Sequence, residues 1–157
     1  GLPAAVGVQI AHPDKLVIDI AGEASVLMTM QEMSTAVQYK LPIKIFILNN
    51  QYMGMVRQWQ ELLHEKNYSE SYTAALPDFV KLAQAYGCVG IQATKPDELD
   101  EKINEMINTK EPVIFDCRVD PAENCFPMIP SGKPHNQMLL GPEDEKEEVS
   151  DEGKTLV

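Results

Sequence analysis

The chain has 157 residues, of which 44% are hydrophobic and 24% charged, a balance typical of a folded globular domain and not of a disordered chain. No apolar run approaches the roughly 18–20 residues that a membrane helix needs, so we expect no membrane partner. The first residues, Gly1-Leu2-Pro3, lack the basic segment that opens a secretory signal. They also lack an initiator methionine, which points to a piece of a longer protein.

Thirteen Lys and Arg against 24 Asp and Glu give a net charge of −11, which makes nucleic acid an unfavourable partner. Residues 142–157 contribute −5 of this charge. We therefore place one domain at residues 1–140 and a solvated acidic tail at 141–157. The three cysteines form no C-x-x-C motif, which argues against a disulfide framework or a zinc site. Reduced thiols are typical of a cytoplasmic protein.

Four short, nearly continuous apolar runs predict strands that are buried on both faces. They are residues 16–20, 43–48, 88–92 and 112–117. Between and after them, apolar residues recur at helical spacing and predict helices around residues 26–37, 55–63, 77–86 and 99–107. Pro77 is expected to open the third of these helices and Gly87 to end it, and Thr94 is expected to cap the fourth.

Strands that alternate with helices indicate βαβ crossovers. We therefore expect an α/β fold, a three-layer sandwich whose mainly parallel sheet is flanked by helices. In such sheets, ligands bind at the carboxyl ends of the strands. The chain from residue 120 onward is rich in Pro and Gly and is expected to be loop.

Small and acidic residues follow the first predicted strand. Residues 22–25 read Gly-Glu-Ala-Ser and directly precede a helix, whose free N–H groups suit a phosphate. The acidic Glu23 would repel a phosphate unless a divalent cation joins the two. Mg2+ commonly binds one or two carboxylates together with phosphate oxygens, so residues 22–25 predict a Mg2+–phosphate site.

Asn49 and Asn50 follow the second predicted strand. The side-chain carbonyl of Asn is a hard oxygen ligand that Mg2+ accepts. A bend after Asn50 would turn a backbone carbonyl, such as that of Tyr52, toward the same ion. Each signal is weak alone, because Gly-x-x-Ser is often a simple strand-to-helix turn and Asn-Asn is often a turn or a helix cap. No G-x-G-x-x-G follows a strand, so a dinucleotide site is not expected.

Taken together, residues 22–25 and the Asn49-Asn50 pair, which are separated by a spacer of 23 residues, resemble the thiamine-diphosphate motif. That motif is usually Gly-Asp-Gly followed, after a spacer, by Asn-Asn. Residues 49–60, with their Gly-Met-Val-Arg-Gln-Trp stretch, are similar to the large subunit of acetolactate synthase (acetohydroxyacid synthase). Residues 77–83 and 124–132 carry the same resemblance. The similarity runs from residue 1 to about 140 and implies the C-terminal, thiamine-diphosphate-binding domain of a larger catalytic subunit.

The resemblance implies roles for ten residues. Those expected to bind the cofactor are Gly22, Glu23, Ala24, Ser25, Asn50, Tyr52 and Met55. Three of these, Glu23, Asn50 and the backbone carbonyl of Tyr52, are expected to bind Mg2+. The substrate channel is expected to include Val56, Trp59 and Ser131, with Trp59 helping to select the second 2-ketoacid. A plain packing role stays open for Trp59, as does a core position for Met55 and Val56.

The implied reaction joins two 2-ketoacids, pyruvate with pyruvate or with 2-oxobutanoate, with loss of CO2, and feeds branched-chain amino-acid synthesis. The family's thiamine-activating glutamate belongs to another domain of the partner subunit, and FAD binds mainly the middle domain. We therefore expect no catalytic residue within residues 1–157 and no activity of this chain alone. The implied partners are further catalytic subunits, in a homodimer or higher oligomer, and a small regulatory subunit.

Two residues depart from the family's motif. Glu23 replaces Asp and adds one methylene to the metal-binding side chain, so that the loop or the ion must shift. Ala24 replaces the second Gly and places a Cβ near the diphosphate. Two alternatives therefore stay open. One is another thiamine carboligase or decarboxylase of the pyruvate oxidase or glyoxylate carboligase type, and the other is a non-catalytic assembly module of the same fold.

Overall fold

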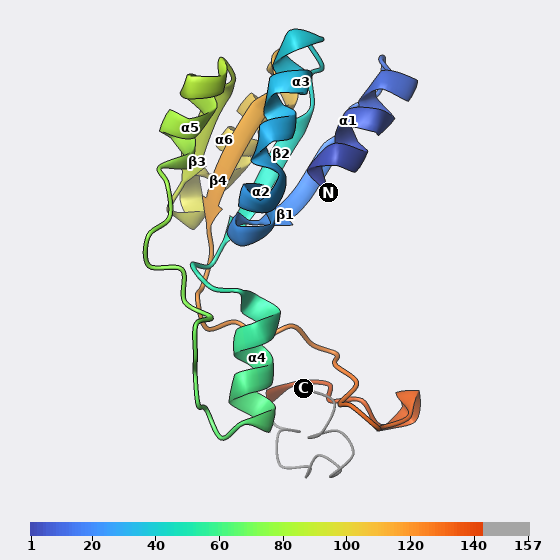
Figure 1. Cartoon of the computed structure of the whole chain (residues 1–157), viewed down its shortest axis with the longest axis vertical. Helices are drawn as coiled ribbons and strands as arrows, with labels where there is room; N and C mark the ends of the chain where they lie inside the picture. The colour runs from blue at the N-terminus through green and yellow to red at the C-terminus, as the bar shows by residue number, and fades with distance from the viewer. Residues whose placement is uncertain (143–157) are drawn as a thin grey trace. The chain divides into compact units, whose positions relative to one another are not determined.

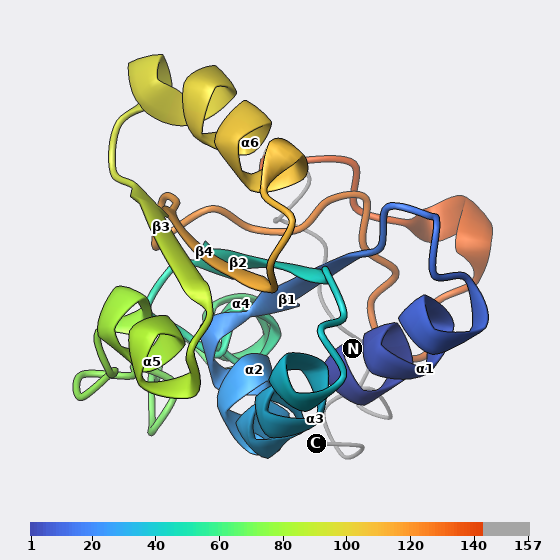
Figure 2. The same ribbon diagram turned by 90° about the horizontal axis from the view of Figure 1, so that it is seen from above.

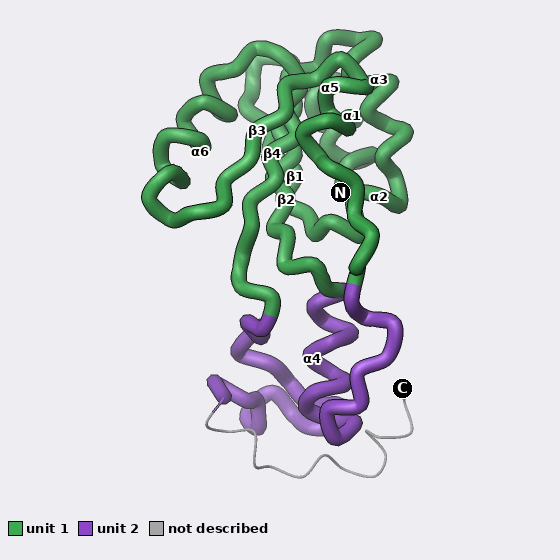
Figure 3. Tube along the Cα trace, turned by 90° about the vertical axis from the view of Figure 1, so that its left-hand side faces the viewer, with its two compact units in different colours: residues 1–52, 73–121 green, residues 53–72, 122–157 purple. Residues whose placement is uncertain are grey.

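The computed structural model describes residues 1–142, so most of the acidic tail expected at 141–157 lies outside the described residues. The chain divides into two compact units (Figure 3). Unit 1 comprises residues 1–52 and 73–121, and unit 2 comprises residues 53–72 and 122–157. The single domain expected at residues 1–140 spans parts of both units, and its boundaries stay a prediction.

Unit 1 is built on a four-stranded parallel sheet with the strand order β1-β2-β4-β3. Its strands are β1 (Ile18–Gly22), β2 (Lys44–Asn49), β3 (Val89–Ala93) and β4 (Val113–Arg118). The four predicted strands are therefore confirmed, although each begins one or two residues later than its apolar run. The run before β1 starts at Leu16, whose side chain is 53% exposed and only leads into the sheet.

Helices cover both faces of this sheet, which confirms the three-layer α/β architecture (Figures 1 and 2). On one face lie α1 (Leu2–Ala11), α2 (Glu23–Thr29), α3 (Met33–Gln38) and α5 (Phe79–Tyr86), and on the other lies α6 (Leu99–Asn108). Ile45 and Ile47 of β2 are buried in a core that includes Phe79 of α5. On the opposite face, Phe115 of β4 shares a second core with Met106 of α6.

Two helices differ from the sequence prediction. The predicted helix over residues 26–37 is divided into α2 and α3 by a turn of 3-10 helix, η1 (Met30–Glu32). Helix α1 was not predicted, because apolar and small residues surround it on all sides and leave no amphipathic stripe. Nevertheless, Leu2 and Val6 of α1 are both core residues.

Two predicted helix starts were wrong in detail. Helix α5 begins at Phe79 with Asp78 as its N-cap, whose carboxylate accepts a hydrogen bond from Lys81 N at 3.0 Å. Pro77 therefore precedes the cap, while Gly87 ends the helix in the left-handed conformation as predicted. Thr94 does not cap α6, because its N–H and hydroxyl both donate to Glu98. A turn of 3-10 helix, η2 (Pro96–Glu98), comes before α6.

Lys44, the first residue of β2, is a buried cation with 1% of its surface exposed. Its Nζ donates to the carbonyl oxygens of Thr109 at 2.7 Å and Glu111 at 2.8 Å, just after α6 ends. Burial lowers the pKa of Lys44 to about 8. These two bonds hold the chain after α6 against the start of β2.

Unit 2 contains the amphipathic helix α4 (Gly54–Leu63), which confirms the helix predicted near residues 55–63. Its other described part, from residue 122 onward, is mostly loop, with a short 3-10 helix, η3 (His135–Gln137). Met128 and Leu139 form an isolated antiparallel bridge through backbone bonds of 2.9 and 2.7 Å. No helix among residues 1–142 is long and apolar enough to cross a membrane.

Gly90 of β3 lies against the backbone of α5, and this close approach can be tested by mutation. A Cβ at residue 90 would lie 2.8 Å from both the Cα and the carbonyl oxygen of Val80. We expect Gly90→Ala to lower the free energy of unfolding by about 1–3 kcal/mol, measured by chemical denaturation. The control is Gly7→Ala in α1, where a Cβ meets nothing within 4 Å. That variant should gain about 0.5–1 kcal/mol, and equal stability of Gly90→Ala and wild type would contradict the packing.

Candidate functional site

The carboxyl ends of β1 and β2 lie side by side, with Gly22 paired to Leu48 in the parallel register. Gly22 ends β1 and precedes Glu23, the first residue of α2. A Cβ at Gly22 would meet only Ser25 Oγ, at 3.9 Å, so the space beside this strand end is open. Ser25 is exposed and Ala24 half-buried. The structure thus brings residues 22–25 to the edge of the sheet where ligands of parallel folds bind.

Glu23 is a buried carboxylate, with only 1% of its surface exposed. Its Oε1 accepts a hydrogen bond of 3.3 Å from Thr73 Oγ1, whereas its Oε2 is buried and has no hydrogen-bond partner among the described residues. Burial raises the pKa of Glu23, and backbone N–H groups, including that of Asn50, partly oppose this rise. A buried carboxylate oxygen without a partner is costly, and a bound cation would compensate it.

The chain bends sharply after Asn50, as predicted. Gln51 adopts the left-handed conformation with φ of 63°. Asn49 Oδ1 accepts from Gln51 N at 3.2 Å, and Asn50 Oδ1 accepts from Tyr52 N at 3.1 Å. Both Asn side chains therefore stabilise the turn, which is one of the roles that the sequence left open. A carbonyl oxygen has two lone pairs, so this bond leaves Asn50 Oδ1 with one for a metal ion.

Asp116 of β4 is a fully buried carboxylate that sequence reasoning missed. Its Oδ1 accepts from Asn49 Nδ2 at 2.8 Å, and its Oδ2 accepts from Gln92 Nε2 at 2.9 Å. Arg118 Nη2 lies 3.1 Å from the same Oδ2. Asp116 thereby joins β2, β3 and β4 near their carboxyl ends and fixes the side chain that begins the Asn49-Asn50 turn. The only signal in the sequence was an acid inside an apolar run.

The donor atoms at this strand end fit a divalent cation of the Mg2+ type. Glu23 offers a carboxylate oxygen, Asn50 an amide oxygen and Tyr52 a backbone carbonyl, all of which are hard oxygen ligands. No group of three or more His, Cys, Asp or Glu residues is placed to hold a metal within residues 1–142. The expected set does not need such a group, because it uses a single carboxylate and leaves positions for phosphate oxygens and water.

In unit 2, α4 presents a second feature, an open hollow of about 840 Å3. Met55, Val56 and Trp59 line it, together with Gln60, Leu63, His64, Glu65 and Asn67. Met55 is 52% exposed and Val56 42% exposed, so neither is a core residue. Ser131, which was also expected at the substrate channel, is half-buried in the loop after Met128 and is not among the residues that line this hollow.

The fold and the strand-end site define a thiamine-diphosphate-binding domain, and comparison with known families agrees. Residues 1–117 match the family model described as "Thiamine pyrophosphate enzyme, C-terminal TPP binding domain". This match covers well over half of the chain, and the chain belongs to that family.

Within the family, the chain is similar to acetolactate synthases. It is 51% identical over 140 residues to the acetolactate synthase large subunit of Cyanidium caldarium, a match that covers 88% of this chain and 24% of the relative. It is 46% identical over 150 residues to the mitochondrial acetolactate synthase catalytic subunit of Saccharomyces cerevisiae, covering 95% of this chain and 22% of the relative. The chain therefore spans about a quarter of the length of these curated relatives.

A solved structure supports the same fold. The thiamine diphosphate-dependent 4-hydroxybenzoylformate decarboxylase of Rhodococcus jostii RHA1 matches with a TM-score of 0.70 and 32% sequence identity. The match covers 76% of this chain and 23% of that protein. The thiamine-diphosphate-binding fold that the sequence motif implied is thus confirmed.

We expect Asp116→Asn to lower the free energy of unfolding by about 1–3 kcal/mol, because an amide cannot accept all three interactions that the buried carboxylate receives. Urea denaturation followed by circular dichroism measures the loss. Asp14→Asn, at an exposed turn, makes the same chemical change and should leave stability within about 0.5 kcal/mol of wild type. Equal stability of the two variants would show that the Asp116 contacts contribute nothing.

Proposed function

We propose that this chain is the thiamine-diphosphate-binding region of an acetolactate synthase catalytic subunit and that it holds the cofactor through Mg2+. The reaction would join two 2-ketoacids, pyruvate with pyruvate or with 2-oxobutanoate, with loss of CO2, as a step of branched-chain amino-acid synthesis. The observation that carries the proposal is the buried oxygen of Glu23, near the Asn49-Asn50 turn, that has no hydrogen-bond partner within residues 1–142. The identity to acetolactate synthase subunits supports the choice of reaction.

Each residue of the strand end has a distinct task in this proposal. Glu23, Asn50 and the Tyr52 carbonyl would bind Mg2+, which in turn would bind the diphosphate. Gly22 leaves open space for the phosphate oxygens, and Ala24 and Ser25 would lie along it. The bound cofactor supplies the carbanion chemistry, whereas these residues only hold and orient it. Asp116 keeps Asn49, and with it the turn, in place.

The hollow on α4 would take the alkyl group of the second 2-ketoacid. Its Met55, Val56 and Trp59 side chains form an apolar surface suited to a short alkyl group. Met55 would also contact the cofactor, and Ser131 would belong to the wall of the channel. A large aromatic side chain can discriminate between substrates that differ by one methylene.

The wider assembly also belongs to this proposal. Because the chain spans about a quarter of its relatives, the rest of the subunit would supply the FAD-binding domain, and another domain of the partner subunit would supply the glutamate that activates thiamine. The catalytic subunits would form a homodimer or a higher oligomer in the cytoplasm. The relatives' name "large subunit" supports a smaller regulatory partner. The chain alone should therefore form no acetolactate, even where it binds the cofactor.

Cofactor binding tests the site directly. We expect calorimetric titration of thiamine diphosphate into the full-length subunit to show binding that requires Mg2+ and disappears with EDTA. Asn50→Ala and Glu23→Gln should each weaken it at least tenfold, roughly 1.4 kcal/mol, because the first removes a metal ligand and the second replaces a charged ligand by a neutral one. Asn104→Ala is the matched control, since Asn104 is exposed on α6.

The outcomes separate the alternatives. Tight binding that is independent of Mg2+ and of both variants would refute the proposed ligand set. Absence of any cofactor binding by the full-length subunit would favour a non-catalytic assembly module. Binding without acetolactate formation from pyruvate would favour another thiamine-dependent carboligase or decarboxylase.

Trp59 tests the substrate assignment. In the full-length subunit supplied with both pyruvate and 2-oxobutanoate, we expect Trp59→Leu to reduce discrimination between the two acceptors by about tenfold, the usual effect of one methylene in an apolar pocket. Quantifying both products gives the ratio, and cofactor affinity should stay unchanged. An unaltered product ratio would show that Trp59 does not select the substrate and only packs against its neighbours.

A further inference from the structure

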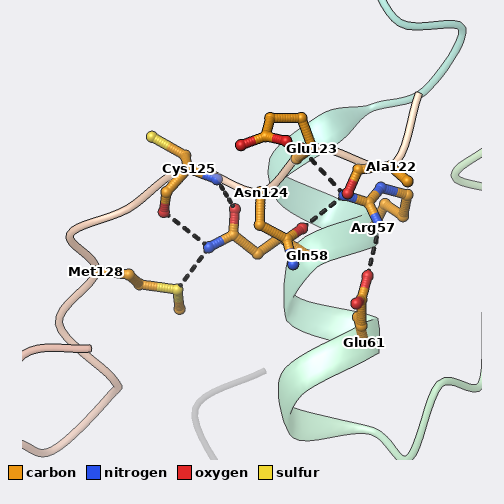
Figure 4. Close-up of polar contacts among 8 residues, drawn as sticks. All are labelled: Arg57, Gln58, Glu61, Ala122, Glu123, Asn124, Cys125 and Met128. Carbon is orange, nitrogen blue, oxygen red and sulfur yellow. Dashed lines mark hydrogen bonds and ion pairs between the residues drawn. The ribbon is translucent and has the colours of Figure 1, made fainter. Parts of the chain in front are cut away.

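Two polar residues of α4 are buried although the proposed function assigns them no task. Arg57 is 5% exposed and Gln58 only 1% exposed. Neither is among the residues that line the hollow, whereas their neighbours Val56 and Trp59 are. Figure 4 shows both side chains directed toward residues 122–128, which lie some 65 positions later in the chain.

Gln58 pairs with the backbone of Cys125 in both directions. Its Nε2 donates to Cys125 O at 3.0 Å, and its Oε1 accepts from Cys125 N at 2.7 Å. The same Nε2 lies 3.0 Å from the sulfur of Met128. An amide is the only uncharged side-chain group that donates and accepts in this way, so the pairing fixes which backbone residue lies opposite Gln58.

Arg57 binds the preceding residues of the same segment. Its Nη2 donates to the carbonyl oxygens of Ala122 at 2.9 Å and Glu123 at 3.2 Å, and to Asn124 Oδ1. Its Nη1 forms an ion pair with Glu61, one turn later on α4. The planar guanidinium therefore has its charge balanced by Glu61 through Nη1, while its Nη2 is directed at residues 122–124.

These contacts hold α4 through two side chains that do not line the hollow. Met128, the last residue that Gln58 contacts, is bridged to Leu139 and lies three residues before Ser131. Trp59 follows Gln58 directly on the helix. Gln58 thus holds the segment that leads to Ser131 against α4, the helix on which Trp59 is the next residue.

We propose that Gln58, supported by Arg57, is a positioning residue that sets the orientation of Trp59 and of residues 128–131 and so tunes the selection of the second 2-ketoacid. Apolar side chains of similar size would fill the same space, but they would not fix the register between α4 and residues 122–128. This inference rests on the proposed function only for its substrate. The positioning itself can be tested without turnover.

The first test uses two readouts on the 157-residue chain. Trp59 is its only tryptophan, so fluorescence emission reports that side chain alone. Hydrogen exchange at the Cys125 amide reports the bond to Gln58. We expect Gln58→Leu to speed this exchange about tenfold and to shift the Trp59 emission. Gln84→Leu, the same change at an exposed site of α5, should alter neither.

The second test uses the full-length enzyme with competing pyruvate and 2-oxobutanoate. We expect Gln58→Leu to change the product ratio about threefold or more, because small displacements of a substrate wall alter discrimination. The change should come through the KM for the second 2-ketoacid. The affinity for thiamine diphosphate should stay the same. A loss of stability alone would lower both products equally. Arg57→Lys keeps the positive charge but loses the planar guanidinium group. It should change the product ratio in the same direction as Gln58→Leu, but by a smaller factor.

The possible results test the proposed function and the positioning role of Gln58 separately. If wild-type enzyme forms neither product, the proposed function fails, while exchange and emission still show whether Gln58 positions Trp59. If Gln58→Leu does not fold, Arg57→Lys provides the same three readouts. Unchanged exchange, emission and product ratio in a folded variant would overturn the positioning role.

Discussion

Asp116 is the residue on which the geometry of the strand-end site depends. Parallel strands bring their carboxyl ends to one edge, but they leave side chains there free to adopt several rotamers. The buried carboxylate removes this freedom by accepting from Asn49 and Gln92 while pairing with Arg118. A charge in this position is tolerated because every contact to it is charge-assisted. The Asn49-Asn50 turn therefore rests on a network that spans three strands.

Glu23 contrasts with Asp116 although both are buried acids. Asp116 has partners for both oxygens, so its burial supports the fold. Glu23 has one long side-chain hydrogen bond and one oxygen without a hydrogen-bond partner among the described residues, so its burial costs stability that the proposed cation would offset. Binding of Mg2+ and cofactor would thus stabilise this strand end. The stability of this region should therefore rise with the cofactor concentration.

The sequence predicted those features that follow from local pattern. Apolar runs identified the four strands, and the spacing of Glu23 and Asn50 identified the strand ends that lie together. It did not predict α1, which has no amphipathic stripe, or the partners of Asp116, which are 24 and 67 residues away in sequence. The same limit applies to Arg57 and Gln58, because a polar residue on an amphipathic helix is normally expected to face solvent.

The replacement of Asp by Glu at residue 23 is easier to accommodate in this structure than the motif alone indicates. One side-chain hydrogen bond, the 3.3 Å contact from Thr73, reaches the carboxylate, beside the backbone N–H groups of Glu23 and Asn50. The Thr73 bond is long, so exchanging it for a bond to an ion would cost little, provided that the Asn50 side of the site stays fixed. The turn at Gln51 and the Asp116 network supply that fixed side. A carboxylate that keeps one oxygen free, opposite an amide fixed by its turn, would let the proposed site meet the strict octahedral geometry of Mg2+, because the carboxylate side would absorb the extra methylene.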